Sequence, residues 1–209
     1  MSPAKSPDSA RVQFIDELPG WTRILPAVLI QTAGAAEERQ ATLKALVARA
    51  LSLNPELVEI EHGRDRPPVV ARPLSAGFYL SVASRGAIAA MAVSRAPVGV
   101  DVEAVDGSSE IPWNVLHPVE VANLRQLSGQ PRATAFARLW SLKEAYLKSL
   151  GVGLKREPSS FRVRFVDGET AEIADPVQPV PISDARTTWR AEAGVWTAIS
   201  AVVLVRIRH

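Results

Sequence analysis

Two acidic side chains stand two residues apart in the stretch VGVDVE, Val98 to Glu103. Its valines alternate with other residues, which predicts a β-strand with the valines on one face and Asp101 and Glu103 on the other. Two carboxylates on one face repel each other unless a cation compensates them. Carboxylate oxygens are ligands that Mg²⁺ prefers, so the pair is a candidate metal site. A solvated strand face is the alternative.

A second charged pattern follows in WSLKEAYLK, Trp140 to Lys148. In a helix, Glu144 and Lys148 lie one turn apart on the same face. Such a pair is ordinarily a surface ion pair that contributes about 0.2–0.5 kcal/mol. A role in chemistry requires partner residues elsewhere in the chain, so both interpretations stay open at this point.

The composition is that of a soluble globular protein. The 209 residues are 47% hydrophobic and 22% charged, enough to bury a sizeable core in one large domain or two small ones. The net charge of +2 and the pI of about 9.2 weakly favour an anionic small molecule or an acidic partner. Nucleic-acid binding is not expected, because no run of Lys and Arg is interleaved with aromatic residues. The absence of cysteine excludes disulfides, thiolate metal sites and cysteine nucleophiles.

No targeting or membrane signal stands out. The N-terminal stretch lacks the apolar core of a signal peptide, and no window approaches the ~18 consecutive apolar residues of a membrane span. We therefore expect a cytoplasmic protein without membrane association. Residues 1–10 are rich in Ser, Pro and Ala, and we expect them to be disordered.

The remaining chain predicts alternating helices and strands. Periodicity predicts helices over 37–53, 115–127 and 133–150, and strands near 78–84, 87–94, 98–103 and 161–165. Residues 62–73, rich in Arg and Pro, indicate a turn followed by an extended loop. Glycines at 151 and 153 end the third helix, and a final hairpin turns at Gly194.

Two hairpin sequences resemble each other. SRGAIAAMAVS and EAGVWTAISAV share their length, a glycine and an alternation of small and apolar residues. This faint repeat predicts an α+β fold of two similar halves, 11–96 and 97–209, each a helix packed on a small antiparallel sheet. A site is expected where the halves meet.

Together, the two charged stretches resemble the 4′-phosphopantetheinyl transferase superfamily, specifically its Sfp-type members. That family carries G-[IV]-D-[IV]-E followed by W-[ST]-x-K-E-[AS]-x-x-K, which Gly99 to Glu103 and Trp140 to Lys148 match. The order and separation agree too, as do the glycines of LGVGL, Leu150 to Leu154. Either motif alone is weak evidence, whereas the pair is specific. The resemblance covers roughly residues 37–205 and is strongest over 99–154.

The resemblance implies the chemistry. It places Asp101, Glu103 and Glu144 around Mg²⁺, and it implies that the phosphopantetheine arm of coenzyme A passes to a serine of an apo acyl or peptidyl carrier protein. Adenosine 3′,5′-bisphosphate is then released. Glu144, or a water that it orients, is the candidate base, and Lys148 is a point charge for the pyrophosphate. A monomer is expected, because shorter members supply one half per subunit.

One position departs from the family. Its members usually carry Ser-His-Ser on the strand before the first motif, and the histidine contacts a phosphate of coenzyme A. Here the segment is Ser81 to Gly86, and Ser84 occupies the histidine position. A serine hydroxyl donates a hydrogen bond but carries no charge. Arg85 is the nearest replacement, although strand alternation points it to the opposite face unless the turn redirects it.

Coenzyme A also needs basic groups for its 3′-phosphate. The loop from His62 to Pro67 resembles the family's Gly-[RK]-Pro loop with two residues inserted, so Arg64 and Arg66 are candidates. Arg39 and Lys44 on the first helix are weaker ones. For each, a solvated surface charge is the alternative.

Two other functions stay open. One is a carrier-binding or coenzyme-A-binding protein of the same fold whose catalytic power has weakened through Ser84. The other is an unrelated Mg²⁺-dependent phosphotransferase.

Overall fold

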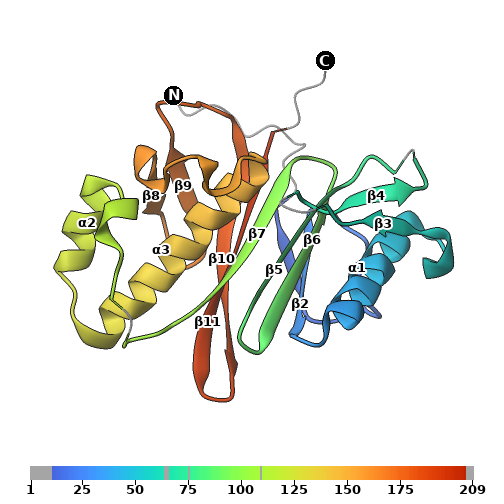
Figure 1. Ribbon diagram of the computed structural model, residues 1–209, viewed down its shortest axis with the longest axis horizontal. Helices are drawn as coiled ribbons and strands as arrows, with labels where there is room; N and C mark the ends of the chain where they lie inside the picture. The colour runs from blue at the N-terminus through green and yellow to red at the C-terminus, as the bar shows by residue number, and fades with distance from the viewer. Residues whose placement is uncertain (1–10, 64–65, 75, 109, 206–209) are drawn as a thin grey trace.

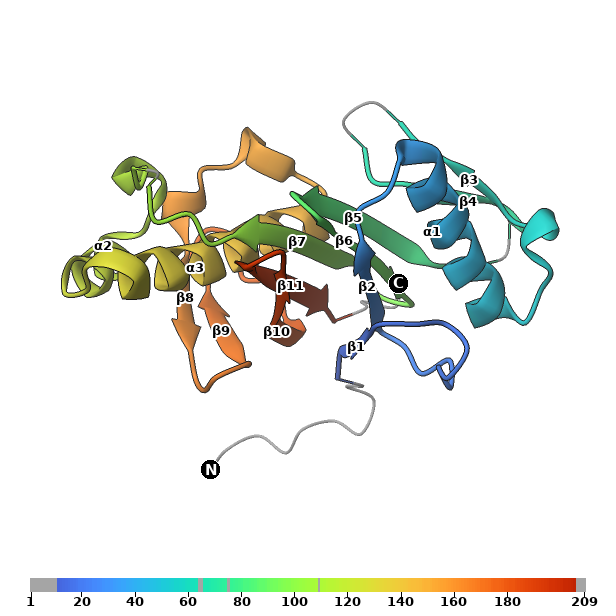
Figure 2. The same ribbon diagram turned by 90° about the horizontal axis from the view of Figure 1, so that it is seen from below.

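The protein is described by a computed structural model that covers residues 11–63, 66–74, 76–108 and 110–205. Four layers follow one another across the molecule: helix α1, two β-sheets, and helix α3 (Figures 1 and 2). The helices are α1 (Ala36–Leu51), α2 (Pro118–Arg125) and α3 (Gly129–Ser149). The first sheet has the order β1-β2-β6-β5, with β1 (Gln13–Ile15), β2 (Ala27–Thr32), β5 (Tyr79–Arg85) and β6 (Ile88–Ser94). The second has the order β10-β11-β7, with β7 (Val98–Ala104), β10 (Ile182–Glu192) and β11 (Val195–Leu204).

Two small hairpins complete the fold: β3 (Glu59–Glu61) with β4 (Val69–Arg72), and β8 (Arg162–Phe165) with β9 (Ala171–Ala174). Apart from β1 in the first half, α2 in the second and the short 3-10 turns, each half runs strand, helix, small hairpin, strand, strand. The strand order β2-β6-β5 in the first half matches β7-β11-β10 in the second, and all these pairs are antiparallel. The expected α+β fold of two similar halves is confirmed. The predicted boundary after residue 96 falls between β6 and β7.

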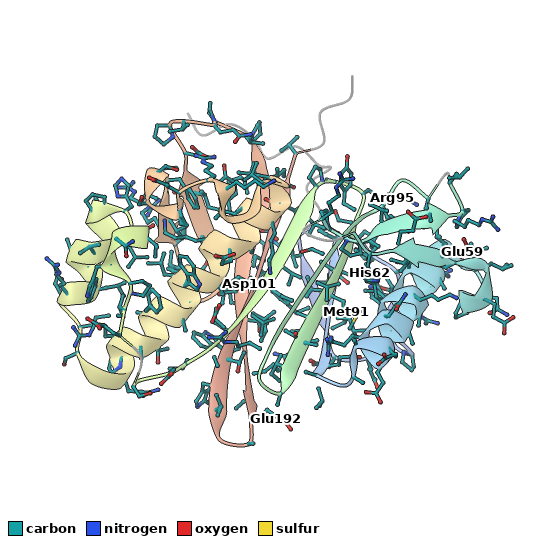
Figure 3. All side chains as sticks on the ribbon, viewed as in Figure 1. Glu59, His62, Met91, Arg95, Asp101 and Glu192 are labelled. Atoms are coloured by element: carbon teal, nitrogen blue, oxygen red, sulfur yellow. The ribbon has the colours of Figure 1, made fainter. Side chains whose placement is uncertain are left out.

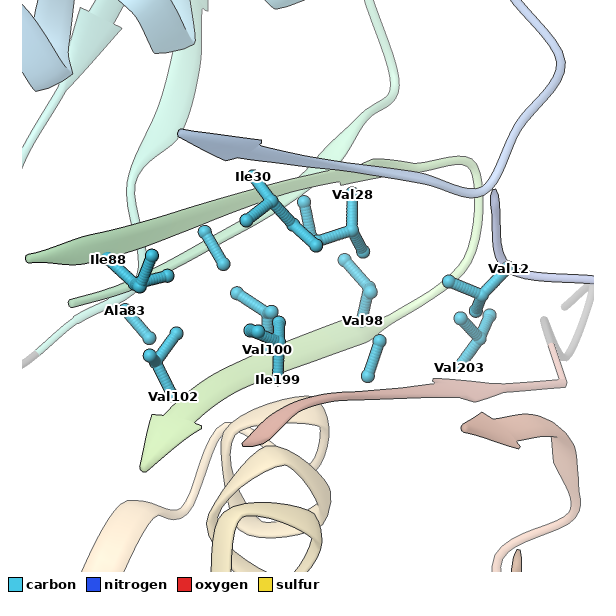
Figure 4. Close-up of a cluster of buried hydrophobic side chains, with 13 residues drawn as sticks. Val12, Val28, Ile30, Ala83, Ile88, Val98, Val100, Val102, Ile199 and Val203 are labelled. Carbon is cyan, nitrogen blue, oxygen red and sulfur yellow. The ribbon is translucent and has the colours of Figure 1, made fainter. Parts of the chain in front are cut away.

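The inner faces of the two sheets form one apolar core (Figure 4). Alternation on β7 sends Val98, Val100 and Val102 into it, where they meet Val28 of β2 and Ile199 of β11. Each such side chain contributes about 1.5–3 kcal/mol when it is fully buried. The opposite face of β7 is thereby turned toward α3.

The outer faces of the sheets carry the helices. α1 packs Leu43, Leu46 and Val47 on the first sheet. α3 packs Leu142 and Tyr146 in the core of the second half. Within the described ranges, none of the helices combines the length and apolarity needed to cross a membrane.

Several elements differ from the sequence-based expectation. The loop predicted over 62–73 is partly wrong, because residues 69–72 form β4 and pair with β3. β2 was not predicted, since AVLIQT is buried over its first four residues and lacks the alternation of a half-buried strand. α2 is shorter than expected and begins with Pro118 at its first position. The expected disorder of residues 1–10 lies outside the described residues.

Candidate active site

Strand β7 and helix α3 meet closely at Gly99. A Cβ atom there would lie 1.9 Å from the carbonyl oxygen of Ala145 and 2.5 Å from the amide nitrogen of Ser149. Only glycine allows this approach of the helix to the strand. The strand's acidic face, with Asp101 and Glu103, is consequently held against the helix that carries Glu144 and Lys148.

Asp101 and Lys148 join the two motifs (Figure 3 labels Asp101 on β7, beside α3). The Lys148 ammonium donates to Asp101 Oδ1 at 2.7 Å and to the carbonyl oxygen of Val100 at 3.2 Å. In the described part of the chain, no ion pair joins Lys148 to Glu144. The basic side chain of the helix, Lys148, therefore pairs with an acidic side chain of the strand, Asp101, across the interface between α3 and β7.

The second oxygen of Asp101 lacks a protein partner. Within the described residues, Oδ2 is buried and accepts no hydrogen bond. Burial raises the pKa of the Asp101 carboxyl, and Lys148 opposes this shift. A buried carboxylate oxygen without a donor is costly, which makes it a candidate ligand for a cation.

Glu103 and Glu144 share the same environment. Burial, followed by the charges of Asp101 and Glu144, raises the pKa of Glu103 to about 7, against the lowering effect of Arg85. Burial and then Asp101 raise the pKa of Glu144. The three predicted carboxylates thus sense one another electrostatically, and a cation among them would relieve the repulsion.

The donor set suits Mg²⁺ in kind, since all three groups offer carboxylate oxygens. Among the described residues, however, no three acidic, histidine or cysteine side chains lie close enough to hold one ion as they stand. Mg²⁺ commonly binds one or two carboxylates and completes its shell with waters and substrate phosphates. Asp101 with one neighbouring carboxylate satisfies that requirement.

Ser84 and Arg85 lie on opposite faces of β5, as strand alternation requires. The arginine is the one that reaches the carboxylates, with its Nε 3.6 Å from Glu103 Oε2. Ser84 is exposed. It is therefore Arg85, on the face of β5 opposite to Ser84, that faces the carboxylates.

A groove of about 250 Å³, here called the Lys148 groove, lies where the two halves meet. Arg66 and Ser81 line it from the first half, and Lys148, Gly151 and Gly153 line it from the second. The Ser81 hydroxyl also accepts a hydrogen bond from the Val100 amide at 3.0 Å, which ties β5 to β7.

A neighbouring groove of about 410 Å³, here called the α1 groove, is lined by Arg39, His62 and Val82. Val82 lines both grooves, which makes them adjacent. Lys44 is half-buried on α1 and lines neither of the two. Arg64 lies outside the described residues.

Another pocket of about 350 Å³ opens beside Glu103 and Arg85. Trp113 and the N-terminal part of α3 line it, including Phe136 and Trp140, whose rings stack with centroids 6.3 Å apart. The sequence did not reveal that the segment after β7 contributes a wall of this pocket through Ala104, Asp106, Gly107, Glu110, Ile111 and Trp113. The sequence feature that could have indicated this wall is Trp113, an aromatic residue at the end of the polar segment that follows the acidic strand.

Residues 97–199 match the sequence profile of the 4′-phosphopantetheinyl transferase superfamily. The chain is 28% identical over 138 residues to a 4′-phosphopantetheinyl transferase of Bacillus subtilis, a match that covers 64% of this chain and 59% of the relative. It is 26% identical over 162 residues to 4′-phosphopantetheinyl transferase Sfp of Bacillus subtilis (strain 168), covering 76% and 70%. A phosphopantetheinyl transferase of Thraustochytrium sp. is 30% identical over 127 residues, covering 54% and 44%.

The chain thus spans about three fifths of the first of these relatives. A solved structure, the holo-[acyl-carrier-protein] synthase of Thermotoga maritima, is similar over 52% of this chain and 63% of its own, with a TM-score of 0.38 and 18% identity. The profile match and the sequence relatives, with both motifs meeting at Asp101 and Lys148, show that the chain belongs to the 4′-phosphopantetheinyl transferase superfamily.

Proposed function

We propose that the protein is a Mg²⁺-dependent transferase that moves the 4′-phosphopantetheine arm of coenzyme A to a serine of an apo acyl or peptidyl carrier protein. The observation that carries this proposal is the contact between Lys148 and Asp101. It brings the two family motifs together at the edge of a groove shared by both halves. Because one chain supplies both walls of the groove, the proposed enzyme is a monomer, and its proposed location is the cytoplasm.

The grooves suit a ligand with several phosphates. Arg66 lines the Lys148 groove and Arg39 lines the α1 groove, so that two guanidinium groups flank the path from Lys148 toward α1. Guanidinium groups bind phosphates through paired hydrogen bonds. In this proposal, Lys148 contacts the pyrophosphate and the arginines contact the 3′-phosphate end. Lys44 is disfavoured by its position, and Arg64 remains a candidate.

Asp101, Glu103 and Glu144 are the proposed Mg²⁺ ligands. Because the described side chains are not close enough to hold one ion together as they stand, the proposal requires that Glu103 and Glu144 adjust toward Asp101 when the ion binds. The unpartnered Oδ2 of Asp101 and the electrostatic crowding of the three carboxylates support this assignment. When bound, Mg²⁺ supplies neutralisation of the pyrophosphate charge and of the charge that grows on the leaving phosphate.

Glu144 is the proposed base. Its carboxylate accepts the proton of the carrier serine as the hydroxyl oxygen bonds to the phosphorus that bears the pantetheine arm. The bond from that phosphorus to the bridging oxygen breaks, and adenosine 3′,5′-bisphosphate leaves with the electron pair. A carboxylate with a raised pKa, as burial gives Glu144, is a stronger base than an exposed one. Lys148 offsets the negative charge on the pyrophosphate.

The test is transfer itself. The protein is incubated with coenzyme A, Mg²⁺ and a panel of apo carrier proteins from fatty-acid, polyketide and nonribosomal-peptide synthesis, and the carriers are weighed intact. We expect a gain of one phosphopantetheine on at least one carrier, and none on the matched carrier whose acceptor serine is alanine.

A second function is favoured by the site around Ser84. The uncharged serine replaces the family's histidine, and Arg85 is engaged with Glu103. A carrier-binding or coenzyme-A-binding protein without transfer would fit these features. If no carrier gains mass although coenzyme A binds measurably, the protein is a binding protein of this kind and not a transferase.

A further inference from the structure

Lys143 precedes Glu144 in the second motif and is wholly buried, with 0% of its side chain exposed. Its ammonium lies 2.9 Å from Glu120 Oε2 of α2. It also donates to the carbonyl oxygens of Pro158 and Phe161, each at 2.8 Å. An ammonium has three protons to donate, so the side chain is fully committed inside the protein.

Glu120 is equally committed. Its Oε1 accepts from the Val163 amide at 2.7 Å, and its Oε2 accepts from the His117 amide at 2.9 Å. The pair therefore ties α3 to the start of α2, to the turn at residues 158–160 and to β8. None of these partners belongs to β7.

Stability alone is a weak explanation for such a pair. Burying two charges costs so much hydration that apolar side chains of similar size often serve as well. What a fully satisfied buried pair provides is a single allowed arrangement, because any shift leaves a charge without partners. The ring of Phe161, 4.3 Å from the Lys143 ammonium, restricts the arrangement further.

The rotation of α3 about its axis decides whether Glu144 and Lys148 face Asp101. Side-chain ends lie about 5–6 Å from a helix axis, so a rotation of ~20° displaces them by ~2 Å. Mg²⁺ requires oxygen ligands at about 2.0–2.1 Å, and a misplacement of ~1 Å costs on the order of 100-fold in rate. Contact at Gly99 fixes how closely α3 approaches β7. Because it involves the Ala145 carbonyl and the Ser149 amide, this contact also restricts the rotation toward the C-terminal end of α3, whereas Lys143 acts earlier in the helix, directly beside Glu144.

We propose that Lys143 is a positioning residue that sets the rotation of α3, and so holds Glu144 and Lys148 against Asp101. Its anchor is Glu120 together with the carbonyl groups of Pro158 and Phe161. The kinetic part of this inference rests on the proposed transfer activity, whereas the structural part does not.

The main variant is Lys143→Met, which keeps the length of the side chain and removes its charge. Because Glu120 then stays buried without its cation, the double variant Lys143→Met/Glu120→Gln is made as well, so that a folded protein without the ion pair is available. The matched control is Met91→Ala, a cavity in the core between α1 and the first sheet, remote from α3 (Figure 3). All variants are compared well below their unfolding temperatures.

Three measurements follow: kcat for transfer, affinity for Mn²⁺ measured by electron paramagnetic resonance, and a crystal structure. We expect the double variant to lose about 100-fold in kcat and about tenfold in Mn²⁺ affinity. The Lys148–Asp101 contact should open beyond hydrogen-bond distance. The Met91→Ala control should keep both values within about twofold of the parent protein.

The proposal is overturned if the double variant folds and matches the control in kcat, in Mn²⁺ affinity and in the Lys148–Asp101 contact. If the parent protein neither transfers nor binds Mn²⁺, the proposed function fails instead. The crystal structures then still decide the role of Lys143, since a retained Lys148–Asp101 contact rejects it and a lost contact supports it.

Discussion

The two halves of the molecule place different residues at corresponding positions. The helix-facing residues of β2 in the first half include Ala27 and Leu29, which pack against α1. The corresponding face of β7 carries Gly99, Asp101 and Glu103. One strand completes an apolar core, whereas the other presents carboxylates to its helix.

The helices differ in the same way. α1 presents Leu43, Leu46 and Val47 to its sheet, each almost fully buried. α3 brings Glu144 and Lys148 to β7, where burial raises the pKa of the glutamate. The second half thus retains charged groups in places where apolar ones would stabilise the fold more. Such an exchange of stability for charge is typical of functional sites.

The largest expected effect is on transfer activity, which should depend on the carboxylates of the second half and not on the corresponding strand of the first. Asp101→Ala and Glu144→Ala should each lower kcat/KM for transfer by about 1000-fold, because each removes a charge-stabilising group from the site. The fold should persist, since the remaining carboxylates repel each other less. Gln31→Ala on β2, in the first half, is the control and should leave the rate unchanged. Near-normal transfer at limiting Mg²⁺ by either variant would show that its carboxylate is wrongly assigned.

The next effect concerns the close approach at Gly99. Gly99→Ala should lower the free energy of unfolding by about 1–3 kcal/mol, because the added methyl group meets the backbone of α3. Denaturant titration measures the change. Gly168→Ala, where a Cβ atom meets nothing within 4 Å, is the matched control and should have little effect. Equal stability of both variants would mean that α3 lies further from β7 than the structure indicates.

A smaller effect depends on pH and on Glu103. Its pKa of about 7 lies above the ordinary value of 4.5, so the folded state binds more protons than the unfolded state between these values. Stability should therefore fall as the pH rises through this window. Relative to the parent protein, Glu103→Gln should raise the free energy of unfolding by on the order of 1–2 kcal/mol at pH 8, after allowance for solvent screening. At pH 4 it should leave the free energy of unfolding unchanged.

The groups that face Glu103 are Asp101, Glu144, Arg85 and Lys148, and the first two drive the shift in the same direction as burial. Thermal unfolding at several pH values, with metal removed, checks this expectation. Glu61→Gln on the exposed face of β3 is the control. If the stability difference between Glu103→Gln and the parent protein does not vary with pH, the expected role of Glu103 is contradicted.

The smallest effect tests the departure from the family. Arg85→Ala should raise KM for coenzyme A about fivefold, or ~1 kcal/mol, because the guanidinium is the cation that β5 turns toward the carboxylates. Ser84→His should lower KM by a similar factor below pH 6.5, where an imidazole is charged and binds phosphate more strongly than a hydroxyl does. If neither variant changes KM, the alignment of Ser81 to Gly86 with the family's strand should be abandoned.

Much of the fold follows from local pattern. The helix predicted over 37–53, the strands near 78–84, 87–94 and 98–103, and the final hairpin all occur with shifts of a few residues at their ends. The elements that the sequence did not reveal are short or buried on both faces. β4 has four residues after two prolines, and β2 lies between β1 and β6 and pairs with both. Such strands depend on partners that are distant in sequence.

The sequence by itself determined which groups could act and on which face of each element they lie. Strand and helix periods are local properties, so the valines of β7 and the Glu144–Lys148 pair could be assigned without a structure. Only the tertiary structure decided the partners: Lys148 bonds to Asp101, and Arg85 reaches Glu103. It also decided that Lys143, next to Glu144, is buried against Glu120. The physical reason is that side-chain partners follow from how α3 packs on β7, and that packing depends on contacts between residues far apart in the chain.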